Sequence, residues 1–352
     1  MPRVLRAALA LLALLTAFSG AQAPAVSPCD LSTTERVVAI GDVHGALDRF
    51  VAILREAAII DKDWHWAGGR AVLVQLGDVL DRGPDSKRVV DLLRSLEVEA
   101  AKAGGQVYPL NGNHELMRMT DDLRYVSAKE YAAFVTSESR ELRDRLYTSA
   151  ADDARGRARA GKEKFDEAAF RKTFYADTPL GLVEMHRAFE ATGEYGRLLR
   201  ARGIVVRING VLFVHGGISP AIAGAGCAAI NARARAEFQS LGAAGAVEPQ
   251  LIARTDGPLW YRGLVDDTVG EADVDTVLDG VGARAIVVGH TVTTDNTIQA
   301  RFGGRVVAID TGMLAGEYFP NGVPSALEIK DGVGTAIYVG KREPIGKIGR
   351  EK

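Results

Sequence analysis

Six short polar clusters, each containing glycine, carry most of the side chains in this sequence that could do chemistry. They are GDVHG (41–45), GDVLDRG (77–83), GNHE (112–115), HGG (215–217), GHT (289–291) and DTGM (310–313). In the first cluster, Asp42 and His44 are two residues apart, and the flanking glycines allow a tight turn in which both side chains face one point. The remaining clusters add a carboxylate, an amide and two imidazoles, from Asp78, Asn113, His215 and His290.

These ligand types together predict a two-metal site. Mixed oxygen and nitrogen ligands suit Mn²⁺, Fe or Zn²⁺ better than Ca²⁺ or Mg²⁺. The set is larger than one tetrahedral ion requires, and one carboxylate can bridge two ions. We therefore expect two divalent metal ions, with Mn²⁺ preferred and Fe or Zn²⁺ as alternatives, roughly 3.5–4 Å apart. Such a pair supports in-line displacement at phosphorus by a metal-bound hydroxide.

Short apolar runs precede these clusters, and they must position them. The runs are rich in β-branched residues, as buried strands are, and cover 36–40, 71–76, 106–110, 211–214, 285–288 and 305–309. Helical patterns over 46–58 and 86–103 alternate with them, which predicts an α/β fold. Ligands of open α/β sheets bind at the carboxyl ends of the strands, so the clusters should converge on one edge. Hairpin signals at Asn209-Gly210, Gly303-Gly304 and Asp331-Gly332 each join two strand-like runs.

Composition limits the class of protein. The chain has 352 residues, of which 47% are hydrophobic and 25% charged, and this balance is typical of a globular protein with a full core. The formal net charge is −2, so the overall charge gives no indication of nucleic-acid binding.

The first 23 residues read as a secretory signal peptide. Arg3 and Arg6 precede the apolar run 7–18, and small residues follow it. The run is too short for a membrane span, so no stable membrane insertion is expected after cleavage. Cleavage after Ala23 fits the pattern, with Ala21 and Ala25 as alternatives. We predict a secreted or periplasmic protein whose catalytic domain covers 32–345.

Export would permit a disulfide between the two cysteines of the chain, Cys29 and Cys227. Their Cα separation cannot be read from the sequence, so the sequence does not decide whether the disulfide forms.

The motifs GDVHG, GDVLDRG, GNHE and VHGGISP (214–220), in this order, closely resemble the phosphoprotein phosphatase family of calcineurin-like metallophosphoesterases. The resemblance extends from about Val37 to Thr311 and implies a four-layer α/β/β/α sandwich. Two later motifs, GPLWYRG (257–263) and DTGM (310–313), depart from the eukaryotic Ser/Thr enzymes. They are similar to the bacterial-type Shewanella-like branch, whose members include phosphotyrosine-preferring enzymes.

The resemblance assigns each ligand to a metal. It implies that the first metal takes Asp42, His44 and Asp78. It implies that the second metal takes Asp78 again as the bridging ligand, together with Asn113, His215 and His290.

The resemblance also implies catalytic and substrate-binding residues. His114 would protonate the leaving-group oxygen, and Asp81 would orient its imidazole. Arg82 would hold phosphate oxygens with its planar guanidinium, and Arg262 is the candidate second clamp, in a region where the spacing differs within the family. Asn113 would also contact substrate. Next to Arg262, Trp260 and Tyr261 could line a pocket for an aromatic leaving group or simply belong to the core.

One absent residue limits the class of phosphate ester that we expect to be hydrolysed. Many diesterase relatives end in Gly-His-x-His, whereas this chain has Val292 in place of the second histidine. Together with Arg82, this favours monoester hydrolysis. We expect a phosphatase acting on phosphoproteins, with phosphotyrosine favoured over phosphoserine or phosphothreonine. The alternatives are a phosphatase of small phosphorylated metabolites or nucleotides, and a non-catalytic phosphopeptide-binding module.

The segment 129–202 is a second departure from the eukaryotic enzymes. It is charged and rich in alanine, as in RGRARAGKEKF (155–165), which predicts a helical insertion. It could form a lid over the metal edge, or it could be a solvated appendage without function.

Overall fold

The computed structural model describes residues 29–242, 249–316 and 318–350. The predicted signal peptide, residues 1–23, lies outside the described residues. Within those described, no helix combines the length and the apolar character needed to cross a membrane.

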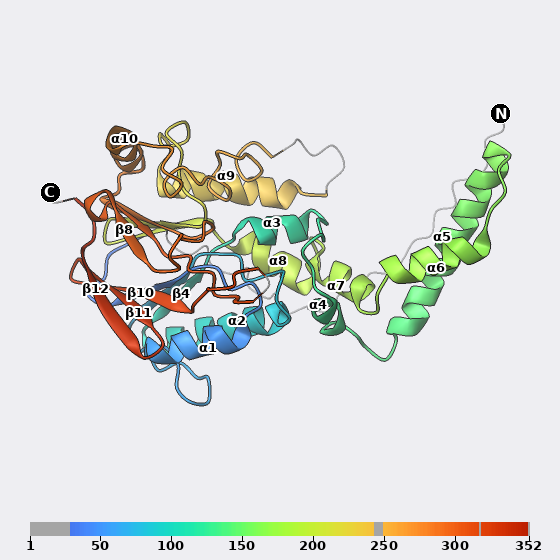
Figure 1. Cartoon of the computed structure of the whole chain (residues 1–352), viewed down its shortest axis with the longest axis horizontal. Helices are drawn as coiled ribbons and strands as arrows, with labels where there is room; N and C mark the ends of the chain where they lie inside the picture. Colours follow the sequence, from blue (N-terminus) through green and yellow to red (C-terminus); the bar gives the residue numbers. More distant parts are fainter. Residues whose placement is uncertain (1–28, 243–248, 317, 351–352) are drawn as a thin grey trace, which may run out of the picture.

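Two six-stranded sheets form the centre of the molecule (Figure 1). One has the order β1 (Asp30–Leu31), β5 (Val205–Ile208), β6 (Val211–Val214), β7 (Ala285–Val288), β9 (Val306–Ala308) and β8 (Gln299–Arg301). The other has the order β12 (Lys341–Lys347), β11 (Val333–Tyr338), β10 (Ser325–Lys330), β2 (Val37–Ile40), β3 (Val72–Gln75) and β4 (Gln106–Pro109). All six strands expected from the apolar runs are present, within a residue or two at each end.

The three hairpin signals are also confirmed. Asn209-Gly210 joins β5 to β6, Gly303-Gly304 lies between β8 and β9 in the short 3₁₀-helix η1 (Phe302–Gly304), and Asp331-Gly332 joins β10 to β11. Each pair of strands is antiparallel. In contrast, β2, β3 and β4 run parallel, as do β6, β7 and β9, so their carboxyl ends lie along common edges.

Alternate residues of the central strands explain how the sheets pack. In β2, Val37 and Ala39 face the apolar core between the two sheets, whereas Val38 and Ile40 face a second core under the helices. Every residue of β2 and β6 is buried, so the sequences of both strands are continuously apolar and do not alternate between apolar and polar residues.

Helices cover the outer face of each sheet (Figure 1). Helices α1 (Leu47–Glu56) and α2 (Ser86–Ala103) lie on one side, and α9 (Cys227–Ser240) and α10 (Glu271–Val281) lie on the other. This arrangement confirms the predicted four-layer α/β/β/α sandwich.

The predicted insertion divides into two parts. Helices α4 (Ala128–Ala132), α7 (Leu182–Phe189) and α8 (Glu194–Ala201) lie close to the body, near α3 (Asn113–Met119). Helices α5 (Ser139–Gly161) and α6 (Glu167–Asp177) form a hairpin that projects away from it (Figure 1). We call these two helices the arm. Helix α6 buries none of its residues, and its rings pack on α5 through contacts such as that of Phe174 with Tyr147, 5.4 Å between ring centroids.

The structure resolves the question that the sequence left open about the cysteines. Cys29 and Cys227 form a disulfide with their Cα atoms 6.0 Å apart. The bridge connects the residue before β1 to the first residue of α9, so it fastens the amino-terminal strand to the helical layer.

Candidate active site

The polar clusters converge at the carboxyl ends of the parallel strands, as the sequence predicted. They surround a cavity of about 140 Å³. Eight of the ten predicted site residues line it: Asp42, His44, Asp78, Arg82, Asn113, His114, Arg262 and His290. The other two, Asp81 and His215, lie directly behind and hydrogen-bond to residues that line it. The structure therefore brings all ten together.

The backbone at this edge is strained. Five non-glycine residues of the site have a positive φ, between 48° and 69°: His44, Asp78, Asp81, Arg82 and His290. Such conformations cost about 1–3 kcal/mol each and persist only where the surrounding structure holds them. Here they turn polar side chains inward immediately after buried strands or tight loops.

Two glycines allow the loops to approach closely enough. A Cβ at Gly77, which has φ of 98°, would overlap the backbone of Gly112. A Cβ at Gly112 would overlap the carboxylate of Asp78. The close approach of the two loops therefore requires glycine at both positions, because the loops after β3 and β4 contact each other through their backbones.

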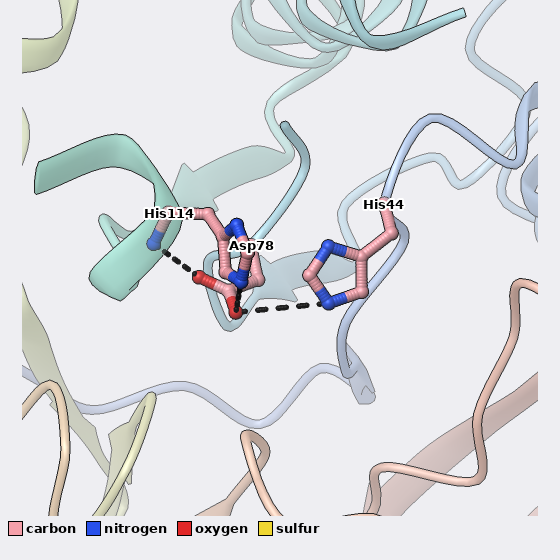
Figure 2. A group of neighbouring side chains, drawn as sticks. All are labelled: His44, Asp78 and His114. Atoms are coloured by element: carbon pink, nitrogen blue, oxygen red, sulfur yellow. Dashed lines mark hydrogen bonds and ion pairs between the residues drawn. The ribbon is translucent and has the colours of Figure 1, made fainter. Parts of the chain in front are cut away.

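Asp78 lies at the centre of the site. Figure 2 shows its carboxylate between the imidazoles of His44 and His114, with Oδ2 3.8 Å from His44 Nε2 and 3.9 Å from His114 Nε2. The same oxygen is 3.4 Å from His215 Nε2 on the other side. Two groups of possible metal ligands, each within 4.8 Å, share this residue: His44, Asp78 and His114, and Asp78, His215 and His290.

Backbone carbonyls fix the orientation of two imidazoles. His44 Nδ1 is 2.9 Å from Leu80 O, and His215 Nδ1 is 3.0 Å from Leu76 O. A carbonyl oxygen only accepts, so each Nδ1 carries the hydrogen, and each ring, when neutral, presents the lone pair of Nε2 to the site. This is the arrangement commonly seen for histidines that bind a metal. Burial alone would lower the pKa of His215, but the carboxylate of Asp78 raises it, so a metal at His215 Nε2 would displace a proton.

Several nitrogen and oxygen atoms of the site are placed so that a cation would fit between them. His215 Nε2 is 2.9 Å from Asn113 Oδ1 and 3.1 Å from His290 Nδ1. His290 Nε2 is buried without a hydrogen-bond partner. Ring nitrogens and an amide oxygen that face one another, with an orphaned buried nitrogen beside them, match the donor set of a divalent ion.

Burial controls the protonation of the candidate ligands. It lowers the pKa of His44 to about 3 and that of His290 to about 2, which keeps both imidazoles neutral and able to bind metal. Burial also raises the pKa of Asp42 well above its ordinary value, and the neighbouring carboxylates of Asp310 and Asp78 add to this. For Asp78, burial is outweighed by the imidazoles of His215, His114 and His44, which hold its pKa well below the usual range.

His114 belongs to a buried chain of charges. Its Nδ1 is 2.7 Å from Asp81 Oδ2, and the other oxygen of Asp81 accepts from Arg118 Nη2. Arg118 also pairs with Glu130 of α4, at 3.2 Å. Burial alone would lower the pKa of His114, but the carboxylates of Asp78 and Asp81 raise it. The imidazole is therefore oriented and favours its protonated form.

Three guanidinium groups line the cavity. Arg82 Nη1 donates to His44 Nε2 at 3.0 Å. Arg262 Nη1 donates to His290 O at 2.7 Å and to the Thr291 hydroxyl at 3.1 Å. The third is Arg124, which sequence reasoning missed because nothing in its local pattern sets it apart.

Aromatic rings surround Arg82. Its guanidinium carbon is 5.5 Å from the ring centroid of Tyr125, 5.5 Å from that of Tyr318 and 5.3 Å from that of Phe319. Trp260 also lines the cavity, which is one of the two positions that the sequence left open for it. Tyr261 does not, because its ring packs beside Gly217 and Gly263.

Two buried carboxylates support the ligands and were given no role from the sequence. Glu115 accepts from the backbone N–H groups of Asp78, Val79 and Gly112, at 2.7–3.0 Å. A glutamate at the third position of a helix is a known capping signal, which could have identified this one. Asp310, in the DTGM cluster, accepts a hydrogen bond from the backbone N–H of Gly312 at 2.9 Å, and it lies beside Asp42.

A four-layer sandwich with two sets of metal ligands sharing one carboxylate at its strand ends defines a metallophosphoesterase. Residues 35–293 match the calcineurin-like phosphoesterase family, and the chain belongs to that family. It is therefore a hydrolase of phosphate esters, and its family implies divalent metal ions.

Comparisons with individual proteins agree with this assignment. The chain is 29% identical over 312 residues to Shewanella-like protein phosphatase 2 of Arabidopsis thaliana, covering 86% of this chain and 77% of that one. It is 25% identical to Shewanella-like protein phosphatase 1 of Plasmodium berghei, over 84% of this chain and 72% of that one. Its structure is similar to that of a cold-active protein-tyrosine phosphatase of a psychrophilic Shewanella species, with a TM-score of 0.67, 28% identity, and coverage of 91% and 83%. The resemblance stated from the motifs is confirmed.

Proposed function

We propose that this chain is a binuclear metal-dependent phosphomonoesterase that prefers phosphoproteins, with phosphotyrosine as the favoured residue and Mn²⁺ as the preferred metal. The observation that carries the proposal is the position of Asp78, whose Oδ2 lies within 4 Å of imidazole nitrogens on both sides. One set of ligands is Asp42, His44 and Asp78, and the other is Asp78, Asn113, His215 and His290. When bound, two ions at these positions would polarise the phosphate and activate water for attack.

His114 acts as the general acid in this proposal, although its Nε2 is also close enough to Asp78 to be a ligand. The contact with Asp81 supports the general-acid role. A carboxylate at Nδ1 stabilises the imidazolium, and a protonated Nε2 is what the leaving-group oxygen requires. Asp81 keeps its charge because His114 and Arg118 lower its pKa against the effect of burial.

Arg82 and Arg262 hold the phosphate. Both line the cavity from opposite loops, and a planar guanidinium can donate two hydrogen bonds to phosphate oxygens. Arg262 is already oriented by His290 O and Thr291, so it does not need to be ordered when substrate binds. Asn113, next to His114, completes the set of polar groups around the substrate.

The aromatic rings at Arg82 support phosphotyrosine as substrate. We call Tyr125, Tyr318 and Phe319 the aromatic rim. A phenyl leaving group bound at Arg82 would contact these rings, and aromatic pairs add about 0.5–1.5 kcal/mol beyond their buried area. A phosphoserine side chain has no ring to make such contacts. The similar structure of a Shewanella protein-tyrosine phosphatase supports the same substrate.

We also propose that the protein is secreted or periplasmic. The basis is the amino-terminal sequence together with the disulfide between Cys29 and Cys227, since disulfides persist in oxidising compartments. Cell fractionation of the full-length product tests this location. Recovery of the protein with residues 1–23 intact in the cytoplasm would contradict it.

A substrate panel tests the proposed function. With Mn²⁺ present, kcat/KM should be at least about tenfold higher for a phosphotyrosine peptide than for the same peptide with phosphoserine. The Phe319→Ala variant should reduce that ratio several-fold, whereas Phe174→Ala on the arm should leave it unchanged. Higher kcat/KM on nucleotides than on any peptide would favour the metabolite phosphatase. Peptide binding without turnover under any metal would favour the binding module.

A further inference from the structure

A second cavity lies behind the active site, on the far side of Arg118. It has a volume of about 350 Å³, which is within the size range of small-molecule sites. Its walls come from the end of α3, from α7 and from the end of α9. Most of the wall is apolar, contributed by Met119, Leu123, Met185, Phe189 and Leu241.

Arg200 is a buried cation at the wall of this cavity. Only 3% of the residue is exposed. Its Nε donates to Phe238 O at 3.1 Å, and its Nη1 donates to the carbonyls of Phe189 and Gly196 at 3.3 and 3.2 Å. Neither a carboxylate nor a partner for Nη2 is found among the described residues. Burial lowers the pKa of Arg200, as expected for a charge without a counterion.

Arg118 differs from Arg200 in having carboxylate partners. Arg118 lines the same cavity and is 4% exposed, but its Nη2 pairs with both Asp81 and Glu130. Its Nη1 contacts the sulfur of Met185 at 3.3 Å, and its Nε is buried without a partner. Nη2 of Arg200 is therefore left for a ligand, whereas the unpartnered Nε of Arg118 is enclosed by protein, and the uncompensated positive charge is that of Arg200.

Charged side chains at the mouth of the cavity limit the charge of a ligand that can bind there. Asp121 and Glu190 lie at the rim, where His186 contacts both, at 3.2 and 3.3 Å. These carboxylates would repel a dianion such as a phosphate monoester. A singly charged anion would satisfy Arg200 at lower cost, and the apolar wall requires an apolar body.

We propose that this cavity binds a small amphipathic carboxylate, whose head group pairs with Arg200 and whose hydrocarbon or aryl body fills the apolar wall. Nothing in the phosphatase chemistry of the neighbouring site requires such a ligand. The cavity would be a separate regulatory site, because Arg118 forms part of its wall and holds Asp81 from behind. A carboxylate bound in the cavity would attract the Arg118 guanidinium in its wall and loosen the pairing of that group with Asp81, and Asp81 orients His114. This second step rests on the proposed role of His114, whereas binding does not.

Calorimetric titration of the full protein with octanoate tests binding, with octanamide as the uncharged match. We expect one octanoate per chain, and affinity for octanamide at least tenfold weaker. Arg200→Ala should weaken octanoate binding at least tenfold, whereas Arg187→Ala, an exposed arginine on the same side outside the cavity, should change it less than twofold. Equal affinity for octanoate and octanamide would overturn the proposal.

A second variant decides the matter if Arg200→Ala does not fold. Ala191 is exposed at the mouth, so Ala191→Trp obstructs the cavity without removing a buried contact. It should abolish octanoate binding, while Ala168→Trp on the arm should not. Unchanged binding in Ala191→Trp would place the ligand elsewhere and refute the site.

Turnover tests the connection to the active site. Saturating octanoate should lower kcat on a phosphoserine peptide at least threefold, with a smaller effect on p-nitrophenyl phosphate, and Ala191→Trp should remove this inhibition. Octanoate binding without any change in kcat would overturn the regulatory step. Failure of the proposed function is distinguishable, since the protein would then lack turnover yet still bind octanoate in the calorimeter.

Discussion

The strand-end site and the arm are built in opposite ways. In the site, the carboxylates and imidazoles are almost completely buried and are held by hydrogen bonds, as Asp81 is by His114 and Arg118. In the arm, the charges are exposed and rings pack on guanidinium groups, as Arg143 does on Tyr175 at 4.7 Å. Exposed cation–π contacts are worth only about 0.5–1 kcal/mol.

This difference separates chemistry from substrate selection. None of the described residues that line the active-site cavity comes from the segment 129–202, so the lid considered from the sequence does not form the wall of this cavity. Among the described residues of that segment, Glu130 of α4 accepts from the backbone N–H of Asp81 and pairs with Arg118, and Met185 and Phe189 of α7 also contact Arg118. The catalytic geometry should therefore depend on the strand-end loops and be insensitive to the arm.

The largest effect should come from Asp78→Asn. Because this carboxylate faces both ligand groups, its loss should weaken both metal sites by at least about 100-fold and abolish most turnover. Elemental analysis after gel filtration checks the metal content, with Asp63→Asn on the surface as the control. Two full equivalents of metal in Asp78→Asn would rule out the bridging role.

His114→Asn should have the next largest effect, and it should depend on the leaving group. General acid catalysis contributes about 10²–10⁴-fold, so turnover of phosphoserine should fall by this factor. Turnover of p-nitrophenyl phosphate should fall far less, because its leaving group needs little protonation. Steady-state kinetics on both substrates provide the measurement, and equal losses would show that His114 has another role.

Arg262→Ala should reduce monoester turnover by about 10²-fold, since it removes one oriented charge donor. Metal content should not change. Arg254→Ala is the matched control, because Arg254 lies on the same segment but pairs with Asp256 at the surface, at 2.6 Å. Wild-type kcat/KM on a phosphotyrosine peptide in Arg262→Ala would mean that the second clamp is a different residue, with Arg124 the next candidate.

The smallest effect should follow from shortening the arm. Asp144 and Tyr175 are joined by a 2.5 Å hydrogen bond, so residues 145–174 can be replaced by Gly-Ser-Gly without separating the ends of the arm. Turnover of p-nitrophenyl phosphate should stay within about twofold, whereas preference among phosphopeptides should change several-fold if the arm contacts protein substrates. An unchanged peptide profile would make the arm a solvated appendage. A loss of p-nitrophenyl phosphate turnover would contradict the separation of the two regions.

The sequence predicted the central strands and the candidate metal ligands because both have local signals. A strand such as β6 is continuously apolar, and a candidate ligand such as His215 follows it next to glycine. Strands β1 and β12 were not predicted: β1 has two residues, and β12 is polar, exposed and contains Pro344. Neither shows the apolar run that identified the others.

Long-range pairs account for what was missed in the site. Arg118 and Glu130 belong to different helices, and their pairing around Asp81 depends on how α3 and α4 pack. The aromatic rim joins Tyr125 to Phe319, which are far apart in the chain. Nothing in their local sequence indicates that they meet at Arg82, so only the tertiary structure reveals them.

The position of β2 has a consequence for how the enzyme is made. Asp42 and His44 follow this strand, which lies between β3 and β10, and Ala39 of β2 pairs with Leu327. Leu327 follows Ala39 by 288 residues, so at about 5–20 residues per second it is synthesised roughly 15–60 s after β2. Until then one edge of β2 has no partner strand and is open to wrong pairing. The catalytic loop is therefore completed late, and a product cut short before β10 would contain all ten site residues without the sheet edge that holds the first two in place.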